Sequence, residues 1–542
     1  MTQRAPMPEA TYPRTDLQPK SAASRARICR RAVTLRRTLA AGLLAATLGA
    51  CHGESPGAVP GVTPAADPGA DAESSSGAPA DAGIPAADVR ADFEDLYRTL
   101  QGSHFDLFVH TPRAEYDALH ASMMADFDES LSLFEIQTRF QKFMAFGRIG
   151  HSRIDFPEAA YTEFRKGGGK TVPFYFRVVD GRVLVTEDYS GTPLSPGDEI
   201  VALEGQPMDR WLERLRGHLS AERAYMAHTM LEFHFPRLIW LELGAIDSLD
   251  LEIRREDGSE ATLEVPTRTR EEIQAAILEA PPSLELDWNA REARMLDDRI
   301  AYLRPGPSYE PTTEDPYDTR PFRAFIDDAF QSFLEADARA LLIDLRDNPG
   351  GDNSFSDLMV SWFADRPFRF CSRFHIRVSP QTTASNRKRL EAAAEEDPES
   401  ISLRFAELYA DREAGDVVDF EVPFAQPRQG ERFTGEVFVL VNRHSFSNTV
   451  MVAALIQDFG FGTILGEETS DLAATYGAME QFQLPRSGLT VGYPKAYIVR
   501  PNGDESVRGV VPDVPITTPV VEGPEDPVLQ EALRVVAERP SE

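Results

Sequence analysis

A serine stands where a predicted strand gives way to a predicted helix. The apolar run 437–441 indicates a buried strand, a short polar turn follows, and a helix of small and apolar residues begins near Asn448. The hydroxyl of Ser447 would lie beside the helix N-terminus, where free N–H groups favour negative charge. A nucleophile that attacks a carbonyl needs such donors for the oxyanion. A plain helix-capping serine fits the same position, and the local sequence alone favours the cap.

A second turn, with paired glycines, follows another apolar run. Residues 340–345 form a continuous apolar stretch, as buried parallel strands do. Gly350 and Gly351 come soon after it and permit tight backbone geometry and the close approach of a ligand. An ordinary chain reversal would also use them.

The elements around these two turns predict the domain that holds them. Strands alternate with helices over residues 299–520, which indicates an α/β domain with a largely parallel sheet. The expected strands are 300–303, 340–345, 437–441 and 463–465, and the expected helices are 322–333, 356–363 and 449–459. Residues 380–415 predict an inserted helical segment, 271–298 a charged connector, and 521–542 a C-terminal helix and tail.

Two smaller domains are predicted before this core. Apolar residues recur at three- and four-residue steps over residues 88–168, which predicts a small helical domain. Residues 169–270 predict strands, with a hairpin at Asp180–Gly181. Within them, 194–207 resembles the G-D-x-I-x-x-I-x-G stretch of PDZ domains, which bind extended peptide ends at a sheet edge. A helical insert near 208–240 departs from a minimal PDZ domain, and the module could equally serve only to shape the cleft.

Composition bounds the function. The chain has 542 residues, 42% of them apolar and 26% charged, which is typical of a globular protein with several cores. A net charge of −31 repels nucleic acid, so nucleic-acid binding is not expected. The spacing of the three cysteines fits neither a zinc site nor a disulfide framework. Cys371 is therefore expected to be a buried, unreactive thiol.

The N-terminal residues predict export. A basic region precedes the apolar run 39–48, which is too short to span a bilayer and is typical of a secretory signal. The signal ends in Leu-Gly-Ala-Cys, which resembles a bacterial lipobox, so 1–51 is expected to be a lipoprotein signal with Cys51 as the acylated residue. An ordinary signal peptide with a chance cysteine is the alternative. Residues 52–87 predict a disordered linker.

In this order, the segments resemble the C-terminal processing (tail-specific) serine peptidase family. That family shows a strand ending in D-L-R-x-N-x-G-G, then V-L-V-N with an S-x-S or T-x-S nucleophile turn, then G-E-x-T and G-x-x-P-D. The matching segments here are 344–351, 439–447, 466–469 and 509–513. The resemblance covers about residues 88–517 and implies a multidomain α/β fold: a helical domain, a PDZ-like domain and a crotonase/ClpP-like catalytic core.

The resemblance assigns roles to the two turns. It places the catalytic nucleophile at Ser447, with Ser445 as a supporting neighbour. The oxyanion donors would be the backbone N–H groups of Asn448 and of Gly350 or Gly351. The implied reaction is acyl transfer through a Ser447 acyl-enzyme, with no metal or organic cofactor.

The general base separates two branches of the family. One branch uses a lysine soon after G-E-x-T, but Leu472 stands about there, and Lys495 is far along the chain. The other branch resembles the catalytic core of tricorn protease and uses a histidine from the N-terminal helical region in a G-H-T or G-H-S motif. Gly150-His151-Ser152 matches it, which implies His151 as the base and Ser152 as a supporting residue. His444 is the rival, although residues three apart across a tight turn seldom meet productively.

The tricorn-like branch also implies a glutamate shortly before G-x-x-P-D that polarises the histidine and serine. Asp504 and Glu505 are the candidates, and Glu505 is the one assigned. Its spacing departs by about one residue from the expected pattern, and a solvated turn carboxylate is the alternative.

These expectations describe an exported peptidase that acts on proteins or peptides at the periplasmic side of a bacterial membrane, held there only by its lipid anchor. One alternative is a catalytically inactive peptide- or lipid-binding lipoprotein on the same fold, although both Ser447 and His151 are present. Another is an acyl-CoA enzyme of the crotonase type, but no basic residues cluster to meet CoA phosphates. The sequence leaves the substrate and the oligomeric state open.

Overall fold

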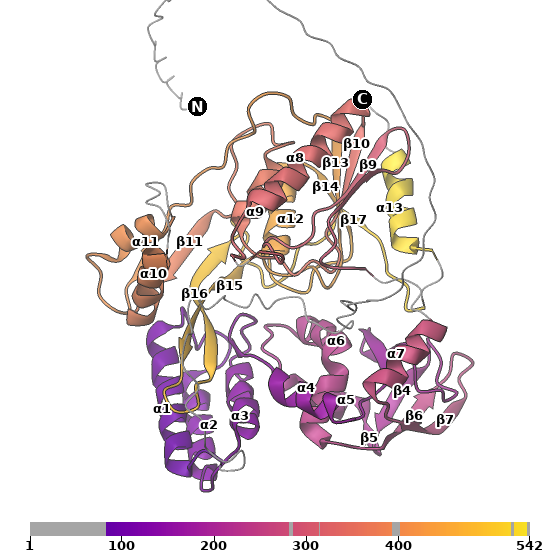
Figure 1. The fold of residues 1–542 in the computed structure, drawn as a ribbon, viewed down its shortest axis with the longest axis vertical. Helices are drawn as coiled ribbons and strands as arrows, with labels where there is room; N and C mark the ends of the chain where they lie inside the picture. Colours follow the sequence, from indigo (N-terminus) through magenta and orange to yellow (C-terminus); the bar gives the residue numbers. More distant parts are fainter. Residues whose placement is uncertain (1–82, 281–285, 314, 393–400, 522–524, 539–542) are drawn as a thin grey trace, which may run out of the picture. The chain divides into compact units, whose positions relative to one another are not determined.

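The computed structural model describes residues 83–280, 286–313, 315–392, 401–521 and 525–538 (Figure 1). The predicted signal, Cys51 and most of the predicted linker lie outside these ranges. The last linker residues belong to the folded part, because Ile84 pairs with Leu131. Within the described ranges, none of the helices combines the length and the apolar character that a membrane span needs.

A six-stranded sheet forms the centre of the α/β core, in the order β17-β14-β13-β10-β9-β8 (Figure 1). Its strands are β8 (Glu292–Met295), β9 (Ile300–Arg304), β10 (Ala340–Asp344), β13 (Glu436–Val441), β14 (Thr463–Gly466) and β17 (Val514–Pro515). β8 pairs antiparallel with β9, and the other neighbours pair in parallel. The expectation of a largely parallel sheet is confirmed.

Helices cover both faces of this sheet, which explains why its central strands are apolar without interruption. On one face, α8 (Arg320–Glu335), α9 (Asn353–Val360) and α12 (Asn448–Phe459) pack on alternate strand residues such as Leu341 and Ile343. On the other, α13 (Pro527–Glu538) packs on Leu342 and Leu440. Cys371 is buried in the first of these cores, as expected, and burial raises the pKa of its thiol to about 12, which disfavours the reactive thiolate.

A second sheet was not expected from the sequence. Its strands are β1 (Arg153–Ile154), β11 (Arg373–Arg377), β12 (Val417–Asp419), β15 (Thr475–Gln483) and β16 (Thr490–Val499), in the order β1-β16-β11-β12 with β15 also on β16. The β15–β16 hairpin leaves the core, and Leu489, Val491 and Tyr493 enter the apolar core of the helical domain. Nearby, α10 (Pro380–Ala392) and α11 (Ile401–Tyr409) form the expected helical insert.

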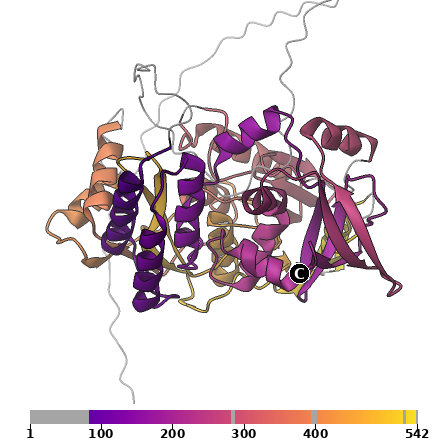
Figure 2. The ribbon, with the colours of Figure 1, turned by 90° about the horizontal axis from the view of Figure 1, so that it is seen from below.

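The helical domain consists of α1 (Ala86–Ser103), α2 (Arg113–Asp126) and α3 (Leu133–Ala145), which lie side by side (Figures 1 and 2). α2 begins directly after Pro112, which fits a first-turn boundary. α3 begins after Ser132, whose side chain and that of Glu135 form a capping box. The predicted small helical domain is thus formed by three helices among the described residues 86–145.

The PDZ-like domain is a sheet in the order β2-β3-β4-β6-β7, with β5 on β4. Its elements are α4 (Glu158–Lys166), β2 (Phe174–Val179), β3 (Arg182–Asp188), β4 (Glu199–Leu203), β5 (Gln206–Pro207), α5 (Met208–Arg216), α6 (Ala224–Leu243), β6 (Ser248–Arg254), β7 (Glu260–Pro266) and α7 (Arg270–Glu279). Asp180 and Gly181 both have positive φ, as the predicted hairpin turn requires. The predicted multidomain α/β fold, with helical, PDZ-like and α/β core domains, is confirmed.

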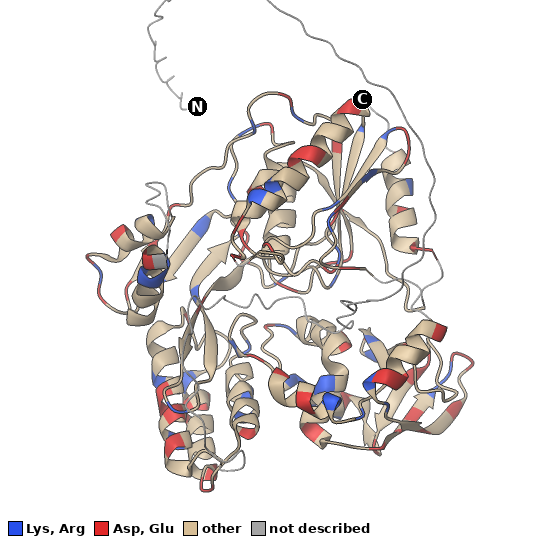
Figure 3. Ribbon diagram, in the orientation of Figure 1, with Lys and Arg blue, Asp and Glu red and all other residues tan. Residues whose placement is uncertain are grey.

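Charged residues do not gather at one place. Figure 3 shows acidic residues spread over the helical domain, the PDZ-like domain and the core, with basic residues interspersed. Charge dispersed in this way favours solubility and does not form a single charged binding surface among the described residues.

Candidate active site

The glycine turn and the serine turn leave neighbouring parallel strands. β10 and β13 pair along their length, so both turns emerge at the same edge of the sheet. The N–H of Phe446 donates to Asn348 O at 3.0 Å, and Ser445 Oγ donates to Leu345 O at 2.8 Å. Because Ser445 is fully buried, its hydroxyl fastens one turn to the other and is not available to a substrate.

Ser447 has a backbone conformation that side-chain-bearing residues rarely adopt. Its φ is +53° and its ψ is −123°. It directly precedes α12, yet its side chain makes no capping hydrogen bond, so the simple cap favoured by the local sequence is not formed. Such strain persists only where the surroundings enforce it, and it concentrates at functional sites. The half-buried hydroxyl remains free for other chemistry.

The glycine turn lies directly against this serine. A Cβ on Gly350 would come within 2.6 Å of Phe446 O, 2.7 Å of Asn448 N and 2.9 Å of Ser447 Cβ. Gly350 also has a φ of +90°, which disfavours a side chain on its own. Only glycine at this position lets the two turns approach so closely.

The backbone N–H groups of Gly351 and Asn448 lie beside Ser447. Neither has a hydrogen-bond partner among the described residues. Gly350 uses its own N–H, which donates to Asn348 Oδ1 at 3.0 Å. Of the two glycines that the sequence left open, the structure therefore offers Gly351 as the free donor. Together with Asn448 it supplies the pair of N–H groups that an oxyanion requires.

Asn448 also holds its end of the helix in place. Its Nδ2 donates to Ser308 Oγ at 3.2 Å and to Ser356 Oγ at 3.1 Å. Ser308 in turn pairs with Gly351 as an isolated parallel bridge. One side chain thus links the two segments that carry the free N–H groups.

His151 lies in the turn between α3 and β1 and is only 5% exposed. Since Arg153 on β1 pairs with Gly492 on β16, the hairpin holds this turn of the helical domain against the core. The imidazole stacks on the ring of Phe446, with centroids 5.5 Å apart and 29° between the ring planes. Its Nδ1 has no hydrogen-bond partner among the described residues, so a ring nitrogen next to the serine turn is free.

A carboxylate that the sequence analysis did not single out joins the two residues. Asp471 is buried, and its Oδ2 accepts the backbone N–H of Ser447 at 2.6 Å. Its charge also raises the pKa of His151, but burial lowers that pKa by more, so the imidazole is neutral at physiological pH. Asp471 directly precedes Leu472, near the position where the lysine branch has its base, which is the signal that could have identified it.

A second carboxyl group lies on the other side of the His151 turn. Glu222 Oε1 accepts the N–H of Gly150 at 2.8 Å. Burial raises the pKa of Glu222 to about 7, and the neighbouring Asp471 charge adds to the rise. Two carboxyl groups therefore flank the turn that carries the imidazole.

The structure does not bring Glu505 to His151. Glu505 is exposed, pairs with Arg373 at 2.7 Å and accepts a hydrogen bond from Tyr497 Oη at 3.2 Å. Asp504, the other candidate, is exposed and accepts hydrogen bonds from Ser506. The carboxylates of this loop face Arg373 and solvent, so Glu505 does not take the assigned role.

His444 is fully engaged. Its Nε2 lies 2.8 Å from Glu232 Oε2 and its Nδ1 lies 3.3 Å from Asp347 Oδ1. Burial opposes the charge on the ring, but the two carboxylates outweigh it and raise the pKa of His444. The residue fastens the serine turn to α6 and leaves neither ring nitrogen free to serve as a base.

The other candidates also have fixed partners. Lys495 is buried and its Nζ lies 2.6 Å from Glu480 Oε1, so it forms an ion pair inside the β15–β16 hairpin. Ser152 Oγ lies 2.8 Å from His104 Nε2, which steadies the turn that carries His151. Within the described ranges, no group of three or more His, Cys, Asp or Glu residues could hold a metal ion.

Comparisons with known proteins match the segment that carries the serine turn and the glycine turn to a peptidase family. Residues 317–516 match the model of peptidase family S41. The structure of mature CPAF complexed with lactacystin superimposes with a TM-score of 0.56 at 16% identity, over 83% of this chain and 97% of that chain. A crystal structure of mature CPAF gives 0.54 at 17% identity, over 79% and 92%. Likeness at such identity concerns the fold alone. No curated relative matches the chain.

The acidic limb of the pH profile reports on His151. The imidazole must be neutral to accept a proton, and burial lowers its pKa, so kcat/KM should fall only below the ordinary histidine pKa of 6.5. In Asp471→Asn the charge that raises this pKa is removed, and the limb should move to still lower pH. Steady-state kinetics across the pH range measure both, with the exposed Asp504→Asn as the control. If the acidic limb of kcat/KM lies at the same pH in Asp471→Asn as in wild type, the Asp471 carboxylate does not act on His151.

Gly351→Ala should disable the oxyanion site. The added Cβ would lie 2.2 Å from Ser308 O, so the segment with the free N–H must shift. Loss of one such donor lowers kcat by about 10²–10³-fold. Gly430→Ala is the matched control, because Gly430 also has positive φ but open space around the added atom. Turnover of an unfolded reporter protein compares them, and equal activity in the two variants would remove Gly351 from the site.

Proposed function

We propose that the chain is a serine-type peptidase of family S41, whose model residues 317–516 match. It cuts protein or peptide substrates through an acyl-enzyme on Ser447, with His151 as the general base. The observation that carries the proposal is the strained Ser447 beside two unpaired backbone N–H groups. The neutral imidazole of His151 stacks on Phe446 of the serine turn, and its Nδ1 has no partner among the described residues, which supports the histidine-dependent, tricorn-like mode over a Ser–Lys pair.

The proposed reaction has two acyl-transfer steps. Ser447 Oγ attacks the carbonyl carbon of the peptide bond while His151 takes the hydroxyl proton, and the oxyanion is bound by the N–H groups of Gly351 and Asn448. His151 then gives the proton to the leaving amine, and the C–N bond breaks. In the second step His151 takes a proton from water, whose oxygen attacks the ester carbonyl. The bond between the carbonyl carbon and Ser447 Oγ then breaks, and His151 gives the proton to Oγ as the acid product leaves.

The carboxylate of Asp471 acts through the other two residues. By accepting the Ser447 backbone N–H at 2.6 Å it holds the strained conformation of the nucleophile. Its negative charge also stabilises the imidazolium that forms when His151 takes the proton. Asp471 is thus a positioning and electrostatic residue, in the place that Glu505 was expected to fill.

Labelling with a fluorophosphonate probe tests these assignments. Wild type should label, Ser447→Ala should not, and the exposed Ser506→Ala should label as wild type does. His151→Gln should slow labelling by about 10²-fold or more, because general-base catalysis is lost. His444→Gln should cost less than about tenfold, because His444 holds the turn but takes no proton. Absence of labelling in wild type would favour the inactive binding protein on the same fold.

Export and anchoring are a separate proposal. We infer from the basic region, short apolar run and lipobox-like end of residues 1–51 that the protein is carried to the periplasmic side and acylated on Cys51. The proteolytic domain would then be tethered to the membrane by lipid alone, with the residues between Cys51 and the folded part at Ile84 as the spacer.

Metabolic labelling with palmitate tests the anchor. Wild type should incorporate the label into the membrane fraction, and Cys51→Ser should lose both label and membrane association. Cys29→Ser, a cysteine change inside the same signal region, should leave both unchanged. Label retained in Cys51→Ser would exclude the lipobox assignment.

A further inference from the structure

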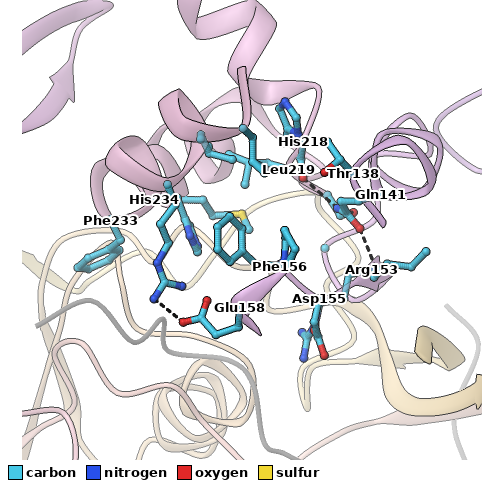
Figure 4. A pocket seen from close by; sticks show the side chains of 18 of the residues that line it. Thr138, Gln141, Arg153, Asp155, Phe156, Glu158, His218, Leu219, Phe233 and His234 are labelled. Atoms are coloured by element: carbon cyan, nitrogen blue, oxygen red, sulfur yellow. Dashed lines mark hydrogen bonds and ion pairs between the residues drawn. The ribbon is translucent and has the colours of Figure 1, made fainter. Parts of the chain in front are cut away.

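A cavity of about 370 Å³ adjoins the proposed catalytic residues (Figure 4). Its walls come from α3, from the segment 153–158, from α6 and from the serine turn. Figure 4 shows Phe156 of the segment 153–158, Phe233 of α6, and Leu219 from the stretch between α5 and α6, around the space. Segments distant in the sequence therefore build one pocket next to the site.

The pocket shares its inner wall with the site. Gly150, Phe446 and Ser470 line it, and each directly precedes a residue of the proposed machinery. Phe446 also stacks on the imidazole of His151 at 5.5 Å. A group that fills the pocket would therefore touch the ring that supports the base, so the pocket is continuous with the active site and not a remote hollow.

The chemistry of the walls favours an apolar occupant. Apolar side chains line most of the space, whereas α3 contributes the polar Gln137, Thr138 and Gln141; the apolar ones include Ile154, Phe156, Leu219, Met230, Phe233, Leu238, Leu241 and Phe446. Burial lowers the pKa of His234 to about 3, so this ring is neutral. The charged wall residues pair with one another, Arg153 with Asp155 and Arg237 with Glu158, so a charged group placed here would lose its hydration and meet charges that are already paired.

The main polar groups of the walls already have partners. Gln141 accepts the N–H of Ile154 and donates to His218 O at 2.9 Å. Arg237 pairs with Glu158 at 2.9 Å, as the dashed line in Figure 4 marks. An occupant therefore meets satisfied polar groups and apolar surface.

We propose that this pocket receives a bulky apolar side chain of the substrate polypeptide, close to the bond that is cut. Pockets that enclose small ligands begin at about 300 Å³, so this volume holds one aromatic or large aliphatic side chain. The proposal rests on the proposed function and names the substrate class: unfolded segments with Phe, Leu, Met or Trp at one fixed position relative to the scissile bond.

Cleavage-site mapping tests this. Digestion of an unfolded protein, with the cut sites located by mass spectrometry, should show bulky apolar residues enriched at that position in wild type. Leu241→Trp fills the pocket from α6, and the preference for Phe over Ala in kcat/KM should fall by about tenfold or more. Leu243→Trp lies on the same helix but outside the pocket, so it should keep the wild-type preference.

A second filling variant and a labelling control keep the outcomes distinct. Thr138→Phe narrows the pocket from α3 and should lower the preference for Phe over Ala, as Leu241→Trp does. One folded variant of the two is enough for the test. Fluorophosphonate labelling of Ser447 should persist in both filled variants, because the nucleophile is unchanged. If wild type itself does not label, the result contradicts the proposed function and not the pocket assignment. An unbiased wild-type profile, or a bias unchanged in both filled variants, overturns the pocket assignment. A third result would also overturn it. Native mass spectrometry would find an apolar small molecule bound to wild type but not to Leu241→Trp, while the two proteins show the same cleavage preference.

Discussion

The close approach of two turns at one edge of the parallel sheet is the constraint on which the candidate site depends. Gly350 lies so near Ser447 that a single added carbon would overlap the serine turn. The approach is fixed by Ser445 and Phe446, which bond to the glycine turn, and by the buried strands from which both turns emerge. Without it, the N–H groups of Gly351 and Asn448 would not face one substrate atom together with the nucleophile.

The remaining parts reach this edge from other domains. The β15–β16 hairpin enters the core of the helical domain and pairs with β1, which fixes the turn that carries His151. α6 of the PDZ-like domain supplies Glu232, which holds His444 on the serine turn. The three domains thus meet at one site, and burial of that meeting point keeps His151 neutral and Phe446 stacked against it. A change in how the helical domain or the PDZ-like domain contacts the core would therefore change the surroundings of His151.

Much of this fold was predictable because its signals are local. The strand–turn–helix around Ser447 follows from an unbroken apolar run, a polar turn and a helix of small residues. The β15–β16 hairpin was missed because β15 is only partly buried and the other partners of β16, β1 and β11, lie on distant segments. Spacing likewise could point to Glu505 but could not show that its carboxylate faces Arg373. Asp471 acquires its role only through a backbone bond to Ser447 that folding creates.

The acyl-enzyme itself is the most direct measurement of the central claim. A slowly hydrolysed ester substrate, quenched during the burst phase and followed by peptide mapping, locates the acyl group on the chain. The account predicts one acyl group per molecule, on the hydroxyl of Ser447. An acyl group on another residue, or turnover with no covalent intermediate in a fully active preparation, would contradict it.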